Sequence, residues 1–367
     1  MVVAEKELGR RLQLVQGIHW LRGVQGDRYA ALLRGYDGAG PQEHYAALRE
    51  AGPLWRSSLG TWVGVGYGVA AELLALPAAA GAAPPAVAWD AELPAREPDA
   101  DRVREPGADR VRELARQVCA RLWAGLGGET DLVAGVAARV PAEVLADLHG
   151  LTGGDRERLA GALSAASGAL DAALAPPAYP EAVRLSAAVA ELRGLLGEGA
   201  VREAVVRVRA ARELLAGALG ALVAAPREWA LLVEQGGGRA ARVVAETLRH
   251  DAPVKVHAFT AAAGAEVAGQ RIAAGDEVAV VVGAANRDPR VFEDPDVFAA
   301  DRVLPDGVRA LVPSPYGIAP EPFGAAVAET VLVALAAARP GLRAAGPAVR
   351  SRRTPVTGGL LRLPVRL

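Results

Sequence analysis

Residues 246–302 hold a spaced set of charged residues and turns that limits the fold more than any other part of the chain. Glu246 and Arg249 are three residues apart in a stretch with helical periodicity, so both side chains fall on one face of a helix. A segment with strand character and a Gly-Asp turn follows, then an Asn-Arg-Asp-Pro sequence at 286–289 and finally Arg302. This order indicates a helix, then small β-hairpins, then a long irregular segment.

Apolar periodicity predicts that the remaining chain is mainly α-helical with small β-sheets. Helices are expected at 5–20, 41–50, 111–222 with breaks near 127–128, 153–154 and 176–177, after 236–238 up to His250, and at 324–338. Hairpins are expected at 54–67 and 254–282, a meander at 286–306, and a loop in the Ala/Pro-rich segment 77–99. We therefore expect one domain over residues 1–367.

Two local features need a separate interpretation. Residues 214–233 are largely apolar but are interrupted by Pro226, Arg227 and Glu228, so they are predicted to form a buried helix followed by a turn rather than a membrane span. A six-residue sequence at 100–105 recurs at 108–113, and two copies are too few for a repeat architecture.

Composition excludes several classes of function. The 367 residues carry a formal net charge of -1 and 4% aromatic residues, so neither nucleic acid nor a membrane surface is an expected partner. The single cysteine excludes an intramolecular disulfide, and the five histidines show no metal-ligand spacing. The first residues lack the apolar core of a secretory signal, so a cytoplasmic protein is expected.

The block at 246–302 resembles the corresponding block of bacterial cytochromes P450, and segments at 131–134 and 140–151 agree with it. The resemblance implies the cytochrome P450 fold. It also implies that Glu246, Arg249 and Arg302 form a buried charged triad that holds the meander to its helix. The alternative for these three residues is a surface ion pair.

The chain departs from the P450 pattern where the haem should bind. In the family a loop after the meander carries the cysteine that ligates the iron, and here that position falls at about Pro322, with the propionate-binding position near Pro320. Proline has no thiolate and no backbone N–H. Cys119 lies too early to substitute, residues 205–216 lack the threonine used in oxygen activation, and residues 78–118 lack a histidine. No cofactor and no catalytic residue are therefore expected.

The N-terminal residues, including Trp20 and Tyr29, resemble the cysteine-less P450 homologues found beside glycosyltransferases in macrolide and anthracycline antibiotic pathways. That resemblance implies an auxiliary protein that binds, stabilises and activates a nucleotide-deoxysugar glycosyltransferase. Residues 1–40 are then a candidate docking segment, and its candidate contact residues are Leu8, Leu12, Val15, Trp20 and Tyr29.

Other interpretations remain open at this point. The apolar stripe of the N-terminal helix could cover the protein's own core instead of a partner. The whole chain could be a haem-less recruitment domain for other biosynthetic enzymes, or a degenerate P450 that keeps a ligand-binding cavity.

Overall fold

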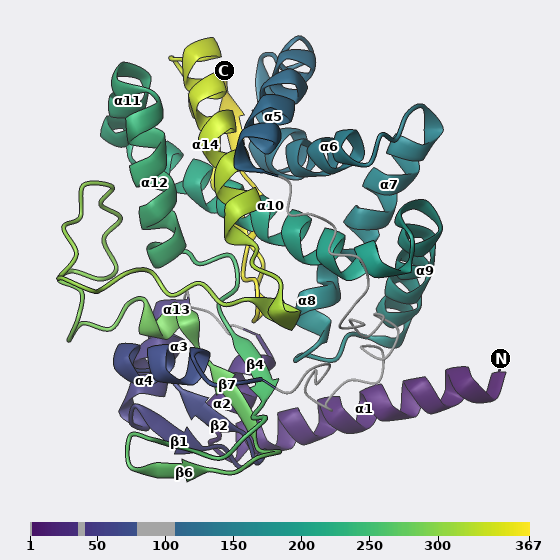
Figure 1. The fold of residues 1–367 in the computed structure, drawn as a ribbon, viewed down its shortest axis with the longest axis vertical. Helices are drawn as coiled ribbons and strands as arrows, with labels where there is room; N and C mark the ends of the chain where they lie inside the picture. Colours follow the sequence, from purple (N-terminus) through teal and green to yellow (C-terminus); the bar gives the residue numbers. More distant parts are fainter. Residues whose placement is uncertain (1, 36–40, 79–106) are drawn as a thin grey trace.

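The fold is seen in a computed structural model that describes residues 2–35, 41–78 and 107–367 (Figure 1). Most of the loop expected at 77–99, the first copy of the repeat at 100–105 and part of the segment 1–40 lie outside the described residues. The second copy of the repeat, 108–113, forms the start of helix α5.

The larger part of the protein is a group of helices. They are α5 (Ala108–Trp123), the π-helical turn η2 (Val133–Ala137), α6 (Arg139–Leu148), α7 (Gly154–Ala165), η3 (Ala166–Gly168), α8 (Ala169–Ala172), α9 (Tyr179–Leu196), η4 (Glu198–Ala200), α10 (Val201–Ala224), α11 (Pro226–Gln235), α12 (Gly237–His250) and α14 (Glu321–Ala338). α10 runs through the middle of this group and is covered by α14 and α12 on one side (Figure 1).

The smaller part combines short helices with the largest sheet. Its helices are α1 (Val2–Val24), α2 (Arg28–Leu33), α3 (Pro41–Glu50), α4 (Tyr67–Leu74) and α13 (Val282–Ala285). The sheet has the order β1-β2-β7-β4 and contains β1 (Leu54–Arg56), β2 (Trp62–Gly64), β7 (Glu277–Val280) and β4 (His257–Thr260). β2 and β7 are parallel, whereas β1–β2 and β4–β7 are antiparallel.

The remaining strands form small sheets at the edges. β5 (Ala265–Val267) pairs with β6 (Gln270–Ile272), and β10 (Leu360–Arg362) pairs with β9 (Val349–Arg350). The C-terminal strand β11 (Pro364–Arg366) lies between β3 (Glu129–Asp131) and β8 (Arg343–Ala344), with Val365 opposite Thr130. The mainly helical fold class with small sheets, expected from the sequence, is thus confirmed.

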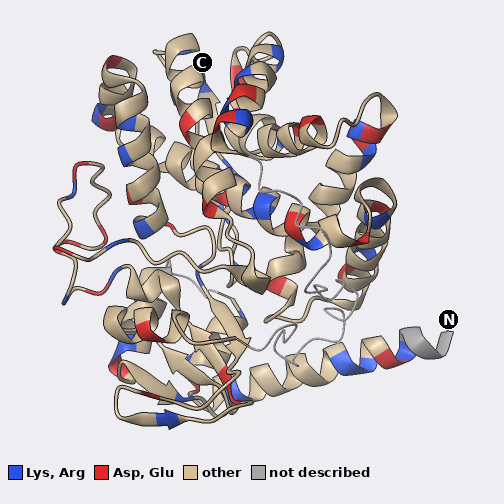
Figure 2. Ribbon diagram, viewed as in Figure 1, with Lys and Arg blue, Asp and Glu red and all other residues tan. Residues whose placement is uncertain are grey.

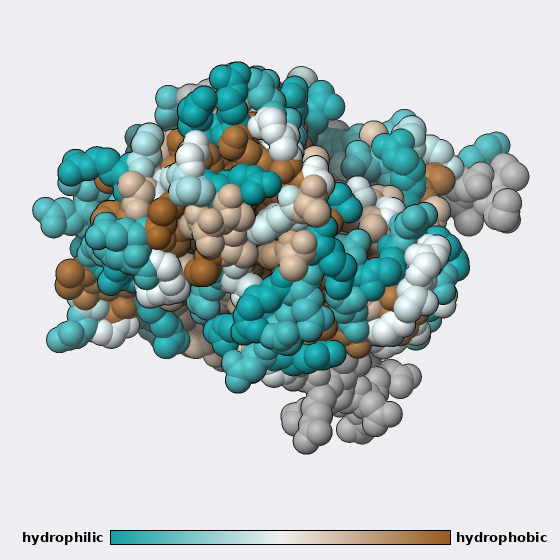
Figure 3. All heavy atoms as spheres, turned by 90° about the horizontal axis from the view of Figure 1, so that it is seen from above, coloured by the Kyte–Doolittle hydropathy of each residue, from teal (hydrophilic) through white to brown (hydrophobic). Residues whose placement is uncertain are grey.

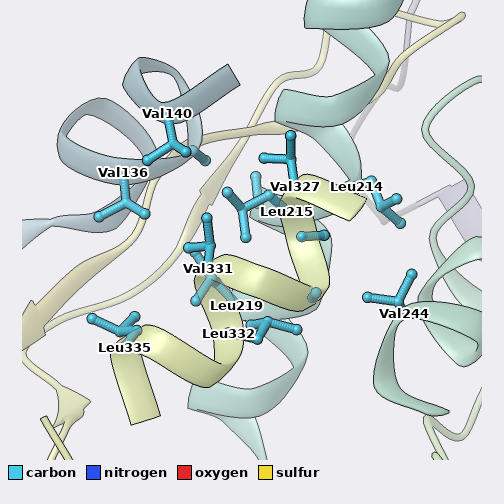
Figure 4. Packing of buried hydrophobic residues seen from close by; sticks show 14 of the residues in the cluster. Val136, Val140, Leu214, Leu215, Leu219, Val244, Val327, Val331, Leu332 and Leu335 are labelled. Atoms are coloured by element: carbon cyan, nitrogen blue, oxygen red, sulfur yellow. The ribbon is translucent and has the colours of Figure 1, made fainter. Parts of the chain in front are cut away.

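The main core lies where α14, α10, α5, α6 and α12 meet (Figure 4). Aliphatic side chains from these helices and from η2 point toward one another in it; those labelled in Figure 4 are Val136, Val140, Leu214, Leu215, Leu219, Val244, Val327, Val331, Leu332 and Leu335. α14 is long and apolar enough to cross a membrane, yet 56% of it is buried inside the protein. We therefore describe α14 as a core helix.

Glycine and proline residues mark several helix boundaries, and one of these boundaries differs from the sequence-based expectation. Gly153 and Gly236 adopt φ values of 53° and 62° before α7 and α12, where a side chain would be strained. The turn expected after the buried helix at 214–224 is instead the start of α11, which begins at Pro226 and is bent by 110° from α10. Proline lacks only an N–H that the first helical turn leaves unpaired, so it begins a helix readily.

Helix α1 extends along the lower edge of the molecule toward the N-terminus (Figure 1). It is fixed to the helical part near the start of α9, because the Gln16 amide donates to the carbonyls of Pro176 and Pro177 at 3.0 Å each. On the face seen in Figure 3, hydrophobic patches are bordered by hydrophilic residues, which is ordinary for a protein surface.

Candidate functional site

Three charged side chains from α12 and the meander meet at one carboxylate. Arg249 donates to Glu246 from Nε at 2.9 Å and from Nη2 at 2.8 Å, and Arg302 donates from Nε at 3.2 Å. Glu246 is 5% exposed and Arg249 is 1% exposed, while the side chain of Arg302 is 11% exposed. The structure therefore brings together the three residues that the family resemblance named.

The two arginines of this triad also hold the backbone of the meander. Arg249 Nη1 donates to the carbonyls of Asn286 at 3.0 Å and Pro295 at 2.9 Å, and Arg302 Nη2 donates to the Val297 carbonyl at 2.7 Å. Buried carbonyls that receive such charge-assisted hydrogen bonds need no water. The triad thus fastens residues 286–302 to the end of α12. This segment follows α13 and contains no helix or strand.

The triad keeps its carboxylate ionised. Burial opposes the charged form, but hydrogen bonds from Arg249 and from the Ala299 N–H, together with the nearby charge of Arg302, hold the pKa of Glu246 below its ordinary value. Breaking such a network leaves a buried charge without a partner, which destabilises a fold strongly. The contacts of the triad are therefore those of a structural clamp between α12 and the meander.

Helices α10 and α14 contact each other directly at the start of α14. Gly324 lies so near α10 that a Cβ built on it would stand 3.5 Å from both Ala211 Cα and the side chain of Leu214. Pro322 lies in the first turn of α14 and offers no thiolate to ligate iron. The residue at the family's ligand position therefore does not fit a haem.

The loop before α14 is packed onto α10 in place of a ligand loop. Tyr316 adopts a φ of 55° and contacts two of the buried clusters. Its ring lies 4.6 Å from the guanidinium carbon of Arg202 on α10, which is a cation–π geometry. A positive φ at a tyrosine is strained, so this contact with Arg202 holds the loop in a conformation that it would not adopt alone.

Cys119 is unsuited to ligate a metal. It lies on α5, is 1% exposed and belongs to the main core. Burial raises the pKa of its thiol to about 12, so the thiolate that binds iron does not form near neutral pH. Among the described residues no group of histidine, cysteine or carboxylate side chains is arranged to hold a metal ion.

A buried charged network on α10 was missed by the sequence reasoning. Arg209 donates from Nη2 to Thr357 Oγ1 at 2.7 Å and lies 3.2 Å from Glu213 through Nη1. Thr357 in turn donates to Asp171 from its hydroxyl at 2.7 Å and from its N–H at 3.0 Å. The sequence signal for this network was the presence of arginines inside an otherwise apolar helix. Residue spacing could not identify the partners of Arg209, because they lie far away in the chain.

The N-terminal residues proposed as partner contacts divide into two groups. The expectation is wrong for Leu12 and Tyr29, which are 2% and 3% exposed and pack into clusters with the protein's own helices. Leu8 and Val15 are partly buried on the same side of α1 as Leu12. Because helix α1 must cover this part of the body, these side chains are not free to meet another protein. Trp20 is 55% exposed and remains available.

A second apolar face of α1 points away from the body. Its residues recur at helical spacing and are among the most exposed large apolar side chains: Leu14 at 63%, Ile18 at 42%, Leu21 at 48% and Val24 at 60%. Residues 12–21 carry no Lys, Arg, Asp or Glu, which leaves the middle of α1 uncharged between its charged ends (Figure 2). The i, i+4, i+7 spacing of Leu14, Ile18 and Leu21 was the sequence signal for this face.

Comparison with known proteins identifies the fold family of this protein. Residues 240–325 match the family model described as Cytochrome P450. The ligand-free structure of Mycobacterium smegmatis CYP164A2 superimposes with a TM-score of 0.72 at 22% identity, covering 93% of this chain and 99% of that one. The ligand-free cytochrome P450 TbtJ1 gives 0.73 at 18% identity, covering 89% and 98%. The fold is therefore that of a cytochrome P450.

Relatives that match over nearly the whole chain assign it to a family and to a group within that family. The chain is 34% identical to protein AknT of Streptomyces galilaeus, covering 98% of this chain and 96% of the relative. It is 35% identical to the cytochrome P450 family protein EryCII of Saccharopolyspora erythraea, covering 98% of each. Protein TylM3 of Streptomyces fradiae is 36% identical, with 97% and 92% covered. The chain belongs to the cytochrome P450 family, in the group that contains these relatives.

Proposed function

We propose that this protein is a haem-less, non-catalytic auxiliary protein that binds, stabilises and activates a nucleotide-deoxysugar glycosyltransferase in polyketide antibiotic biosynthesis. The observation that carries the proposal is Pro322, which offers no iron ligand at the family's cysteine position, while the rest of the P450 fold is kept. The near-full-length similarity to AknT and EryCII, and the N-terminal resemblance described above, support the partner.

A P450 fold that keeps the triad but lacks the iron ligand can still act by binding another protein through its surface. Glu246, Arg249 and Arg302 still hold the meander, although the first turn of α14 offers no iron ligand at Pro322. A binding partner needs this rigidity, since an ordered surface loses less entropy on association than a mobile one. We therefore infer that the scaffold presents a fixed interface and contributes no reacting group.

The outward face of α1 is the interface that we propose for the glycosyltransferase. Leu14, Ile18 and Leu21 form one exposed ridge, with Trp20 beside it. Large exposed apolar side chains with an aromatic residue are typical of the desolvated centre of protein interfaces. Arg10 and Arg22 flank the uncharged stretch and are suited to meet acidic side chains at the rim of the partner.

Activation then follows because binding is coupled to the conformational equilibrium of the glycosyltransferase. A protein that binds only the competent conformation of the glycosyltransferase raises the population of that conformation by its differential affinity. The same binding stabilises the enzyme against unfolding, because free energy gained only in the folded state shifts the folding equilibrium. Both effects require a soluble complex, and we expect it in the cytoplasm, with neither nucleic acid nor membrane involved.

The test is co-expression with the proposed partner, a nucleotide-deoxysugar glycosyltransferase. Wild-type protein is expected to co-purify with the enzyme, whereas Leu21→Glu places a charge in the proposed interface and is expected to abolish co-purification. Val233→Glu, at an apolar site on α11 that is 39% exposed, is the matched control and should bind normally. Equal binding by both variants would move the interface away from α1. Co-purification of a haem P450 instead would support a recruitment role.

A further inference from the structure

The structure contains a second feature that the proposed function does not use, a cavity of about 420 Å³ between α6, α7 and α10. Its apolar walls come from these helices, from η2 and from the strand β10, and they include Val133, Ala142, Leu163, Val205, Val208 and Leu361. A cavity of this volume lies within the range that small organic ligands occupy. The α10 residues that line it differ from Ala211 and Leu214, which meet Gly324.

Guanidinium groups line the cavity together with its apolar walls. Arg209 and Arg212 lie on α10, and Arg139 lies on α6 at an exposed position. Arg209 is paired with Glu213 and with Asp171, which lies 3.8 Å away, and Arg212 is paired with Glu213. The Nε of Arg209 is buried and has no hydrogen-bond partner within the part of the chain that the structure describes. Arg139 makes no ion pair with any described residue, so the lining holds one uncompensated positive charge at its mouth and one unsatisfied donor deeper in.

The acidic residue in the lining does not offset the charge of Arg139. Glu143 is bonded to Arg156, with Nη2 of the arginine 2.5 Å from Oε2, so its charge is already neutralised. Ser164 and Ser167 of the lining add hydroxyl groups that can donate to an anion. Unsatisfied donors in a low-dielectric setting favour a negatively charged occupant, since an orphaned buried N–H is costly.

We propose that this cavity binds a small amphipathic organic anion, a carboxylate attached to an apolar body. The carboxylate meets Arg139 at the mouth and Arg209 deeper in, and the apolar body lies against Val205, Val208 and Leu163. A ligand in this position contacts α6, α7 and α10 at once and therefore stabilises their packing. The site is separate from the outward face of α1, so the ligand and the glycosyltransferase do not compete for the same residues.

The experiment uses the full chain with sodium decanoate, kept below its aggregation concentration, and with 1-decanol as the uncharged analogue. Decanoate is expected to bind by calorimetry and to raise the midpoint of thermal unfolding, and decanol is expected to bind at least about tenfold more weakly, the equivalent of one charge-assisted hydrogen bond. Equal binding of the two compounds, or no binding of decanoate, overturns the proposal.

Two variants locate the ligand. Arg139→Gln removes an exposed guanidinium from the mouth and is expected to weaken decanoate about tenfold, while Ala160→Trp on α7 fills the cavity from its rim and is expected to abolish binding. Arg110→Gln, at an exposed position on α5 outside the cavity, is the matched control and should bind as wild type. Unchanged binding in both cavity variants, or loss in Ala160→Trp with none in Arg139→Gln, contradicts the proposal. No glycosyltransferase is present, so these results are independent of the partner assay.

Discussion

Gly324 of α14 lies against Ala211 of α10, and a Cβ on the glycine would stand 3.5 Å from the alanine Cα. This contact belongs to the main core, in which α10, α14, α5, α6 and α12 bury aliphatic side chains against one another (Figure 4). Burial of this apolar surface stabilises the helical part of the fold through the protein's own side chains.

The first prediction concerns Pro322. Because the propionate-binding position near Pro320 is a proline as well as the ligand position at Pro322, Pro322→Cys alone is expected not to restore haem binding. The measurement is an absorption spectrum after reconstitution with haem, with and without reductant and carbon monoxide. Wild type and variant should both lack a thiolate-bound haem band. A band in the variant would show that only the ligand is missing, and a band in wild type would contradict a haem-less protein.

The second prediction concerns the clamp. Glu246→Ala leaves Arg249 buried without its partner and is expected to lower the free energy of unfolding by about 3–5 kcal/mol. Arg302→Ala should cost less, since its side chain is more exposed at 11%. Glu266→Ala, an exposed carboxylate on β5, is the control and should change stability little. Chemical denaturation checks all three variants. Wild-type stability in Glu246→Ala would show that the triad does not stabilise the fold.

The third prediction concerns pH. Burial lowers the pKa of His257 from 6.5 to about 4, so the folded state resists protonation while the unfolded state accepts it. Stability is therefore fully present above pH 6.5 and falls as the pH drops from 6.5 toward 4. His257→Gln should make this decline shallower by up to about 1.4 kcal/mol per pH unit, one proton's worth. Denaturation curves at several pH values test it, and an unchanged slope would mean that His257 is accessible to protons when folded.

The fourth prediction separates the two faces of α1. Leu12 is buried, so Leu12→Glu is expected to destabilise the fold by at least about 2 kcal/mol. Leu21 is 48% exposed, so Leu21→Glu should leave the unfolding free energy unchanged within about 0.5 kcal/mol. Thermal or chemical denaturation of both variants decides the point. Similar stability losses would show that the helix buries both faces.

Much of the fold could be predicted from sequence because its signals are local. The helix at 41–50 and the strands around the turn at Gly60 lie where periodicity and turn residues placed them. The residues of the triad came from a resemblance that fixes their order, and the structure shows their contacts.

Other features depend on information that a sequence pattern does not hold. On α1, Leu8, Leu12 and Val15 form one apolar stripe and Leu14, Ile18 and Leu21 form another, and periodicity cannot say which stripe faces the body. Pro226 marks a break, but a proline can end one element or begin the next. The link between Arg209 and Thr357 joins positions 148 apart in the chain, and no local rule connects them.

We propose that this protein activates a glycosyltransferase without any haem of its own. The most direct measurement is the turnover of the purified partner glycosyltransferase with and without the haem-free protein, using its nucleotide sugar and acceptor. Turnover is expected to rise when the haem-free protein is added, and added haem is expected to change nothing. No rise in turnover, or a rise that requires haem, would contradict it.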